Sequence, residues 1–386
     1  MMQIAGSYPK IKDDIIIYPA VIWIIAYEFL ERTNFTFNWN GIYGLPLSIE
    51  RVCRIIVLFF AIYNVVKEED IGRKILYSFL IVLGWFTSVM LLVLWVSLAG
   101  RSMKTWLSVG VGTVITMFAI TIASSCMGII GMGRHGTWEG NFFGMATQGQ
   151  ISFVLLFLMM GAAVLRGGRF AYYEYVAMYL IIFFNTYVYR RRNANICMTV
   201  LVTMLVVRHI YLRCVKKEGI GRFIKCVQKC FFDYCFILAY AVFMICVFLR
   251  DYIRILQPRL PWLRTFLIRL DDTAEIWRAF PLTLFGNYIH EYAGGNATSL
   301  LFDPLFSRTL LYDGLAVFTV LMIVTTYFMV KARQREEGVI YIAFMVMALF
   351  SISDPVAWDV GLNFLIALPF AEWDIPTRKD RSLPAL

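Results

Sequence analysis

Long apolar segments separated by short polar turns run along almost the whole chain. Each segment is long enough, or nearly so, to cross a hydrocarbon core of about 30 Å as an α-helix. They lie near residues 15–30, 51–66, 75–99, 106–131, 151–165, 172–189, 195–213, 231–250, 310–330, 338–353 and 355–371. This pattern predicts an all-α polytopic integral membrane protein with about 11–12 transmembrane helices.

The composition agrees with this class. The chain of 386 residues is 60% hydrophobic and only 16% charged, which is not the balance of a soluble domain of this size. The opening MMQIAGSYPKIKDD is polar and lacks a small-residue cleavage site. We therefore expect the first apolar segment to be retained as an anchor.

The lysines and arginines set the expected topology. Basic clusters in the loop 213–229, the turn 331–335 and the tail 378–381 are assigned to the cytoplasm by the positive-inside rule. The net charge of +10 is thereby explained by topology, and no nucleic-acid partner is expected. Counting spans back from the tail places residues 250–309 outside. It also places the turn with Arg190 and Arg191 outside, against the rule.

The run 75–99 decides where the amino terminus lies. If it is a hairpin of two short half-helices turning near Thr87 and Ser88, the amino terminus and the turn 67–74 are both cytoplasmic. The alternative is one long span with an external amino terminus. Parity favours the hairpin.

Three regions are expected: an N-terminal transmembrane bundle (1–250), a large extracytoplasmic loop with short helices (251–309), and C-terminal transmembrane helices with a cytoplasmic tail (310–386). From 250 to 309 the chain contains seven arginines and no lysine, which favours forked recognition of phosphate or carboxylate. The alternative is that these arginines pair with the loop's own acids or with lipid headgroups. RLDDTAEIW (269–277) predicts a short amphipathic helix, and the turn residues after it indicate a folded lid.

Several chemistries are disfavoured. The chain has no phosphate-cradling G-x-x-x-x-G-K-[ST] motif, and the DD at 271–272 is not the D-x-D of metal-dependent nucleotide-sugar transferases. Its three histidines, His135, His209 and His290, are too few for a histidine-rich metal site. No metal or other cofactor is expected.

Five motifs occur in a recognisable order: GRHGTWEGNFFG (133–144), YVYRRRN (187–193), RLDDTAEIW followed by PLTLFGN (269–287), FDPLFSRTLLYDGLAVF (302–318) and ISDPVAWDVGLNFLI (352–366). This order resembles that of the Wzy-type polymerases, the oligosaccharide repeat-unit polymerases of capsule and O-antigen synthesis. The chain departs from that family in having Tyr189 where the family has Ser, and Pro304 where it has Asn.

The resemblance implies a GT-C-like, membrane-embedded glycosyltransferase in a bacterial inner (plasma) membrane with an extracytoplasmic active site. It would transfer a growing glycan from undecaprenyl diphosphate to the non-reducing end of a lipid-linked repeat unit, without a metal. The partners implied are the lipid-linked oligosaccharide donor and acceptor, membrane lipid, a chain-length regulator and a flippase.

The expected site residues follow from position and from the resemblance. Arginines would neutralise the diphosphate, and a base would accept the proton of the incoming hydroxyl. Substrate binding is assigned to Arg134, His135, Trp138, Asn141, Arg190, Arg191, Arg278 and Arg308. Catalysis is assigned to Asp303, His290 and Arg269, with the base chosen from His290, Glu291, Asp303, Asp313 and Asp354.

Two other functions stay open at this point. A glycan ligase shares the architecture and usually depends on a histidine in the large external loop, a position that His290 could fill. A secondary transporter or lipid-linked-oligosaccharide flippase would predict internal repeats and broken mid-membrane helices. No repeat is visible in the sequence.

Overall fold

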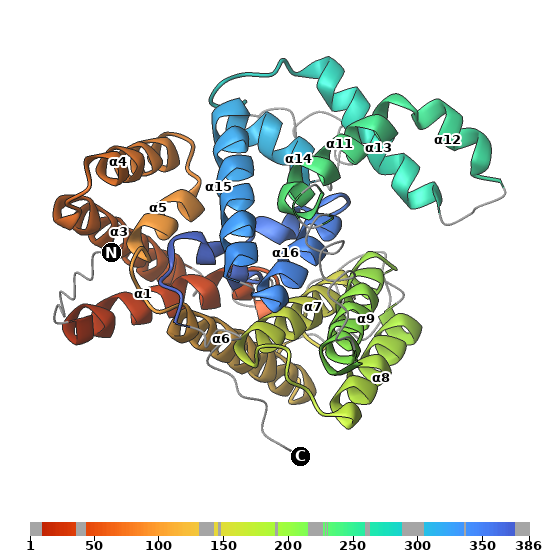
Figure 1. Cartoon of the computed structure of the whole chain (residues 1–386), viewed down its shortest axis with the longest axis horizontal. Coiled ribbons are helices and arrows are strands. Elements are labelled where there is room, and N and C mark those ends of the chain that lie inside the picture. The colour runs from red at the N-terminus through yellow and green to blue at the C-terminus, as the bar shows by residue number, and fades with distance from the viewer. Residues whose placement is uncertain are drawn as a thin grey trace. The chain divides into compact units, whose positions relative to one another are not determined.

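In the part of the chain that the computed structural model describes, the regular secondary structure is helical (Figure 1). The described residues are 10–35, 44–130, 143–145, 148–189, 192–214, 227, 229, 231–258, 263–287, 305–335 and 337–374. Within them the β pairing is limited to two isolated bridges, Thr33 with Met145 and Ser102 with Glu372. The predicted all-α class is confirmed.

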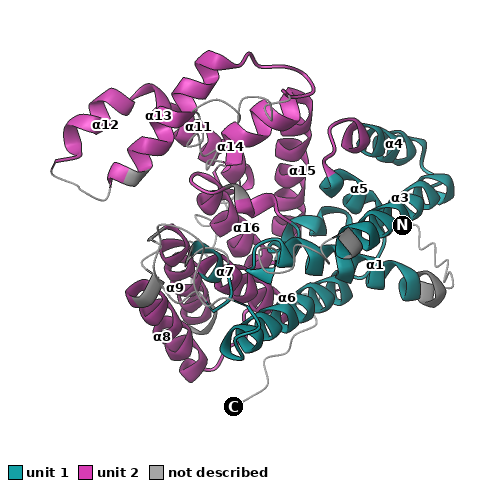
Figure 2. Cartoon of the chain, turned by 180° about the vertical axis from the view of Figure 1, so that it is seen from behind, with its two compact units in different colours: residues 1–82, 90–151, 360–372 teal, residues 83–89, 152–359, 373–386 magenta. Residues whose placement is uncertain are grey.

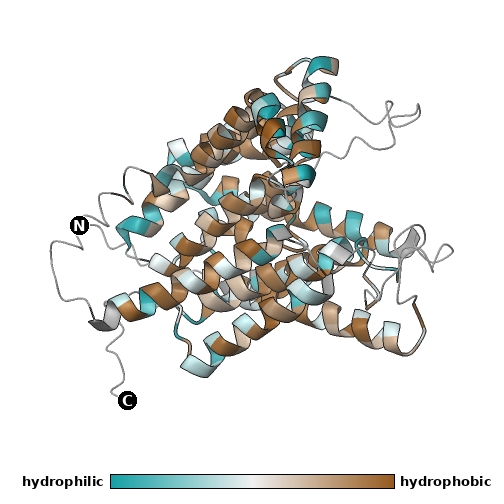
Figure 3. Cartoon of the chain, turned by 90° about the vertical axis from the view of Figure 1, so that its right-hand side faces the viewer, coloured by the Kyte–Doolittle hydropathy of each residue, from teal (hydrophilic) through white to brown (hydrophobic). Residues whose placement is uncertain are grey.

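Apolar helices support the assignment to a membrane. In the described ranges, three helices are long and apolar enough to cross one, and a bent pair adds a fourth if it counts as a single span. Large apolar side chains also lie on the surface, among them Phe59 (65% exposed), Trp85 (67%) and Phe248 (76%). Figure 3 shows apolar residues along most of the helices. Exposure of this kind is typical of a lipid-facing protein. The count of about 11–12 spans, their orientation and the GT-C-like arrangement stay predictions.

The chain divides into two compact units (Figure 2). Unit 1 contains residues 1–82, 90–151 and 360–372, and unit 2 contains residues 83–89, 152–359 and 373–386. Residues from near the carboxyl end therefore complete the first unit. The three regions expected from the sequence, with boundaries at residues 250 and 309, are defined by the predicted external loop and not by compactness. They stay a prediction.

Unit 1 is built from helices whose bounds are α1 (Lys10–Leu30), α3 (Gly44–Lys67), α4 (Ile71–Phe86, ending in unit 2), α5 (Met90–Ser97) and α6 (Met103–Cys126). Helix α3 packs against α1 and α5, and α1 also packs against α6. The Asn64 amide of α3 donates to the carbonyl oxygens of Val96 (2.8 Å) and Ser97 (3.1 Å), which ties α3 to the carboxyl end of α5.

The predicted break in the run 75–99 is present. Helix α4 ends at Phe86, Ser88 has a left-handed backbone (φ 58°), and α5 begins at Met90. The Thr87 hydroxyl donates to the Leu83 carbonyl (2.7 Å) at the end of α4. The break is thus confirmed at the residues where the turn was expected, and a hairpin that enters and leaves the membrane on one side stays a prediction.

The run 355–371 was expected to be one span, and this expectation is wrong. The structure has two short 3₁₀ helices instead, η4 (Pro355–Trp358) and η5 (Phe364–Phe370). Proline begins η4, and Pro369 lies inside η5 and cannot donate a backbone hydrogen bond. A regular α-helix through both prolines is therefore disfavoured.

Two tryptophans of unit 1 hold η5 in place. Trp95 Nε1 donates to the Ile366 carbonyl (2.7 Å), and Trp106 Nε1 donates to the Phe364 carbonyl (2.8 Å). Gly110 of α6 lies so close to Phe364 that an added Cβ would be 2.7 Å from the Phe364 Cβ. Irregular backbone is tolerated in a membrane protein where protein groups satisfy it, and these indoles do so.

Unit 2 contains the remaining elements. Their bounds are α7 (Gln148–Leu165, beginning in unit 1), α8 (Tyr172–Tyr189), α9 (Arg192–Cys214), η1 (Phe232–Tyr234), α11 (Cys235–Phe248), α12 (Arg250–Leu256), α13 (Leu263–Ala279), α14 (Leu305–Arg308), the π-helix η3 (Thr309–Asp313), α15 (Gly314–Gln334), α16 (Gly338–Ser351) and η4. Helix α16 packs against α9, α11 and α15.

A buried ion pair joins three elements of unit 2. Asp233 of η1 is 2% exposed, and its carboxylate accepts from Arg333 Nε (2.9 and 3.1 Å) and from the Tyr341 hydroxyl (2.9 Å). Arg333 lies in the last turn of α15 and Tyr341 in the first turn of α16. Because a carboxylate is buried at little cost only when it is paired and hydrogen-bonded, this cluster clamps η1 to α15 and α16.

The predicted external loop begins with a sharp bend. Helices α11 and α12 meet at Leu249 with an angle of 76° between them. Helix α12 then packs against α13, the helix that contains RLDDTAEIW. Because α13 runs from Leu263 to Ala279, the predicted amphipathic helix is confirmed and is longer than expected. The loop contains a helical hairpin and is not a linker.

Candidate functional site

Two segments of unit 2, both part of the motifs described above, meet backbone to backbone. They are residues 280–287, after α13, and residues 305–316, which form α14, η3 and the start of α15; we call this contact the glycine crossing. Gly286 (φ 86°) and Gly314 (φ 88°) both have left-handed backbones. A Cβ added to Gly286 would overlap the Tyr312 carbonyl, and one added to Gly314 would lie 2.5 Å from the Leu284 oxygen. Only glycine fits at either position.

Hydrogen bonds fix the crossing. The backbone N–H of Asn287 donates to the Leu311 carbonyl (2.7 Å). The Asn287 side chain donates to the carbonyls of Pro281 (2.9 Å) and Leu311 (3.2 Å). In the sequence the Gly-Asn step was only a turn motif. In the structure it is the attachment point of the turn to the π-helix.

The crossing also caps α15. The first N–H groups of a helix have no partner within the helix. Here the Leu315 N–H donates to the Thr283 carbonyl and the Ala316 N–H to the Leu284 carbonyl, both at 3.0 Å. Asp313 occupies the N-cap position, but its side chain makes no capping hydrogen bond. The turn backbone therefore caps α15 in place of the aspartate.

A small apolar core lies under the crossing. Ile276 of α13 and Leu311 of η3 are buried together, and Trp277, Phe280 and Tyr312 pack against them. Three buried polar atoms of these segments have no hydrogen-bond partner among the residues that the structure describes, namely Trp277 Nε1, Thr283 Oγ1 and Ser307 Oγ. Ser307 is only 2% exposed. Buried polar groups are normally satisfied, so these three atoms are candidates for hydrogen bonds to a ligand or to water.

The π-helix is the second unusual feature of the site. Helix η3 spans Thr309–Asp313, and the Gly314 N–H donates to the Thr309 carbonyl five residues back. Such widened turns are rare and are frequent at functional sites. This one contains Tyr312 and Asp313, both half-buried, and follows Arg308, which is exposed. An arginine, a tyrosine and an aspartate are thus concentrated in one widened turn.

Two arginines predicted to bind substrate lie in or beside the segments of this crossing. Arg278 follows Trp277 at the end of α13, and Arg308 ends α14. Both are exposed, and neither forms an ion pair with a carboxylate in the part of the chain that the structure describes. A guanidinium without a protein counter-ion can pair with a phosphate group.

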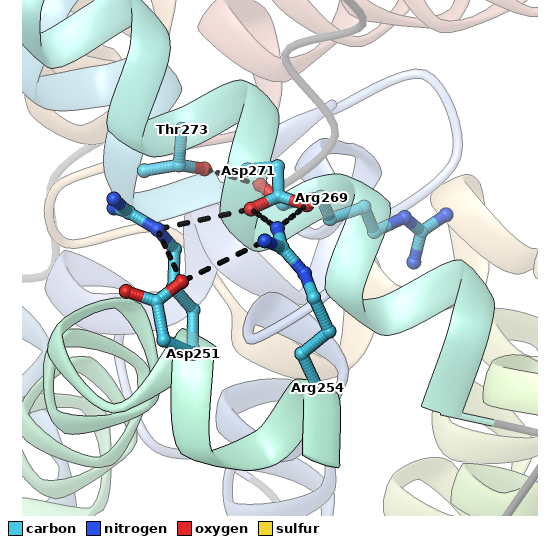
Figure 4. A network of polar contacts seen from close by, with 6 residues as sticks. Asp251, Arg254, Arg269, Asp271 and Thr273 are labelled. Atoms are coloured by element: carbon cyan, nitrogen blue, oxygen red, sulfur yellow. Dashed lines mark hydrogen bonds and ion pairs between the residues drawn. The ribbon is translucent and has the colours of Figure 1, made fainter. Parts of the chain in front are cut away.

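Other arginines of the loop pair with its own acids. Arg254 Nη2 donates to both oxygens of Asp271 at 2.7 Å, and Arg250 Nε lies 3.7 Å from Asp271 and 3.8 Å from Asp251 (Figure 4). These contacts join α12 to α13. The alternative weighed from the sequence, a loop whose arginines pair internally, therefore holds for Arg250 and Arg254.

Arg269 lies on α13 near this cluster but is oriented differently. It is half-buried, and its backbone carbonyl accepts from the Thr273 hydroxyl (2.7 Å). In Figure 4 its guanidinium points away from Asp251, Asp271 and Arg254. This orientation shows only that Arg269 is not part of the α12–α13 ion pairs. Its catalytic role stays a prediction.

Most of the predicted site lies outside the described residues. This holds for the 133–142 motif with Arg134, His135, Trp138 and Asn141, for Arg190 and Arg191, and for His290, Glu291 and Asp303. Of the predicted site residues, Arg269 and Arg278 both lie on α13, and Arg308 ends α14.

Buried polar residues that were not singled out from the sequence form a second cluster. The Ser152 hydroxyl donates to Asn185 Oδ1 (3.1 Å), the Asn185 amide donates to Asn195 Oδ1, and all three residues are buried. Asn195 Nδ2 has no hydrogen-bond partner in the described part of the chain. The signal available in the sequence was an amide inside each of two apolar runs, which is costly in a membrane and therefore informative. This cluster ties α7, α8 and α9 together.

Comparisons with known proteins give no relatives: no family model, no curated protein and no solved structure matches the chain. The resemblance to Wzy-type polymerases therefore rests on the five motifs in the sequence. In the described residues, no group of three or more His, Cys, Asp or Glu side chains is arranged to hold a metal ion.

Proposed function

We propose that the chain is a membrane-embedded glycosyltransferase, a repeat-unit polymerase that transfers a growing glycan from undecaprenyl diphosphate to the non-reducing end of a lipid-linked repeat unit. The reaction takes place on the outer face of a bacterial inner membrane. It needs cations for the leaving diphosphate and a group to accept the proton of the attacking hydroxyl.

The glycine crossing is the observation that supports this function best. It joins the PLTLFGN and FDPLFSRTLLYDG motifs, which are separate in the sequence, through a contact that only glycines permit. Arg308 and Asp313 lie in the segment 305–316, Arg278 lies next to Trp277 at the end of α13, and three buried polar atoms of these segments have no hydrogen-bond partner among the described residues. Such a set of groups fits a site for a diphosphate and a sugar better than it fits a structural contact, which would satisfy its own polar atoms.

The cationic groups in this proposal are guanidinium groups. Arg308 and Arg278 neutralise the diphosphate as the glycosidic carbon leaves it, because their forked donors match phosphate oxygens. Arg190 and Arg191, on the predicted outer side, are assigned to the same diphosphate. Trp138 is assigned to stacking on a sugar ring. The donor and acceptor lipids reach the site from the bilayer, and the chain-length regulator and the flippase act beside it.

Deletion of the gene tests this function directly. Loss of a polymerase leaves single repeat units on the final acceptor. Loss of a ligase instead leaves polymer unattached, and loss of a flippase traps repeat units on the cytoplasmic face. Normal polymer in the deletion strain, or either of the last two outcomes, would refute the polymerase proposal.

A further inference from the structure

We propose that Asp313 is the residue that accepts the proton of the incoming sugar hydroxyl. This inference rests on the proposed function and names one residue within its site. Asp313 was one of the five candidates for the base, behind Asp303 and His290, which lie outside the described residues. The structure provides three observations in its favour.

The first observation is that Asp313 does not perform the structural task its position suggests. An aspartate directly before a helix usually accepts hydrogen bonds from the second or third N–H of that helix. In α15 these donors belong to Leu315 and Ala316, and they bind the carbonyls of Thr283 and Leu284 instead. Asp313 makes no capping hydrogen bond. The glycine crossing thus leaves its carboxylate available.

The second observation is that this carboxylate is otherwise unengaged. Asp313 is half-buried, and its carboxylate forms no hydrogen bond or ion pair with the residues that the structure describes. A carboxylate at the end of a membrane-embedded helix is costly to keep without a partner, so it marks a functional place by default. In the predicted topology this end of α15 faces the outer side, where both lipid-linked substrates lie.

The third observation is the neighbour that the π-helix provides. Arg308 directly precedes the π-helix and Asp313 ends it, and the hydrogen bonds of a π-helix join residues five apart where those of an α-helix join residues four apart. The widened turn therefore brings both residues toward the same face. Arg308 is close enough to act electrostatically on Asp313 but forms no ion pair with it. A phosphate on Arg308 would thus lie near a carboxylate that can take a proton.

The chemistry balances with these two residues. The acceptor hydroxyl oxygen forms a bond to the anomeric carbon of the donor glycan, and its proton passes to the Asp313 carboxylate. The bond between that carbon and the diphosphate oxygen breaks, and the electron pair leaves with undecaprenyl diphosphate, whose charge Arg308 neutralises. Asp313 returns its proton to solvent at the half-exposed end of the helix.

The experiment compares Asp313→Asn, Asp313→Glu and a matched control, Glu275→Gln. Glu275 is an exposed carboxylate on α13 with no ion pair among the described residues. Each variant is reconstituted in vesicles with lipid-linked repeat units extracted from a strain that lacks the gene. Polymer formation, binding of undecaprenyl diphosphate and the thermal midpoint are measured. The amide cannot accept the proton but preserves the size of the side chain.

If Asp313 is the base, Asp313→Asn should lose about 10²–10⁴-fold in rate. It should retain diphosphate binding and the thermal midpoint, while Asp313→Glu keeps part of the activity and Glu275→Gln stays near wild type. A rate for Asp313→Asn within threefold of wild type would overturn the inference, as would a loss of diphosphate binding or of folding in both Asp313 variants. No polymer from the wild-type protein would instead refute the proposed function.

Discussion

Gly286 and Gly314 cross with their backbones in contact, and the contact is possible because neither residue has a side chain. Both have left-handed backbones, and hydrogen bonds from Asn287, Leu315 and Ala316 hold the two segments together. The crossing makes the capping of α15, the shape of the π-helix and the position of Arg308 depend on one another.

Gly286→Ala and Gly314→Ala should both disrupt this site. The left-handed backbone alone costs about 1–2 kcal/mol for a residue with a Cβ, and the overlap with neighbouring backbone atoms adds to this cost. We expect a lowered thermal midpoint and loss of polymer formation. Gly112→Ala is the control, because a Cβ there meets nothing within 4 Å. Wild-type behaviour of Gly286→Ala would contradict the close contact.

The loop arginines should separate into two groups. Arg308→Ala and Arg278→Ala should lose polymer formation, because each removes a cation that has no carboxylate partner among the described residues, and Arg308→Lys should recover only part of it. Arg254→Ala should stay within a few-fold of wild type, since an exposed ion pair contributes only about 0–1 kcal/mol. Both groups are assayed with the same lipid-linked repeat units. Full activity in Arg308→Ala together with loss in Arg254→Ala would reverse the assignment.

The clamp around Asp233 should be important for stability and not for chemistry. Asp233→Ala leaves Arg333 without its buried partner, and breaking a buried pair in this way typically costs about 3–5 kcal/mol. Tyr341→Phe removes one hydrogen bond to a charged group and should cost about 1.5–3 kcal/mol. Unfolding in detergent measures both. Equal midpoints for Asp233→Ala and the wild type would show that the pair contributes nothing.

Trp106→Phe should destabilise unit 1 more than its loss of volume suggests. The substitution removes the indole donor and leaves the buried Phe364 carbonyl unsatisfied, at a cost of about 1–3 kcal/mol. Trp85→Phe is the matched control, because that indole is 67% exposed. A similar thermal midpoint for the two variants would mean that the hydrogen bond to Phe364 is not needed.

Local features of the fold were predictable where short-range physics decides them. Apolar length indicated membrane helices, the Thr87–Ser88 step indicated the break between α4 and α5, and the spacing of apolar residues in 269–277 indicated α13. The run 355–371 misled because its apolar length matches a span. Pro369 inside the run and the indoles of Trp95 and Trp106, which bind its carbonyl oxygens, favour 3₁₀ helices over a span.

The sequence predicted which residues form the candidate site but not how they are arranged. The motifs and Arg278, Arg308 and Asp313 were visible in the sequence, but the crossing joins residues that are 28 positions apart through backbone geometry. A π-helix has no sequence signature that separates it from an α-helix. The partners of Asp233, 100 and 108 positions away, could not be assigned either, although Asp233 is the one acid in the apolar run 231–250.

The 3₁₀ helix η5 has a consequence for how the protein is made. Seven residues at about 2 Å each extend only about 14 Å, so this segment cannot enter a bilayer as an independent span. Its backbone carbonyls accept hydrogen bonds from Trp95 and Trp106. These tryptophans are synthesised 271 and 258 residues before the residues whose carbonyls they bind. Unit 1 therefore stays incompletely folded after α5 and α6 have been synthesised, until residues 360–372 emerge from the ribosome. Nascent chains truncated before residue 360 should be substrates for membrane quality control, because their first unit cannot close.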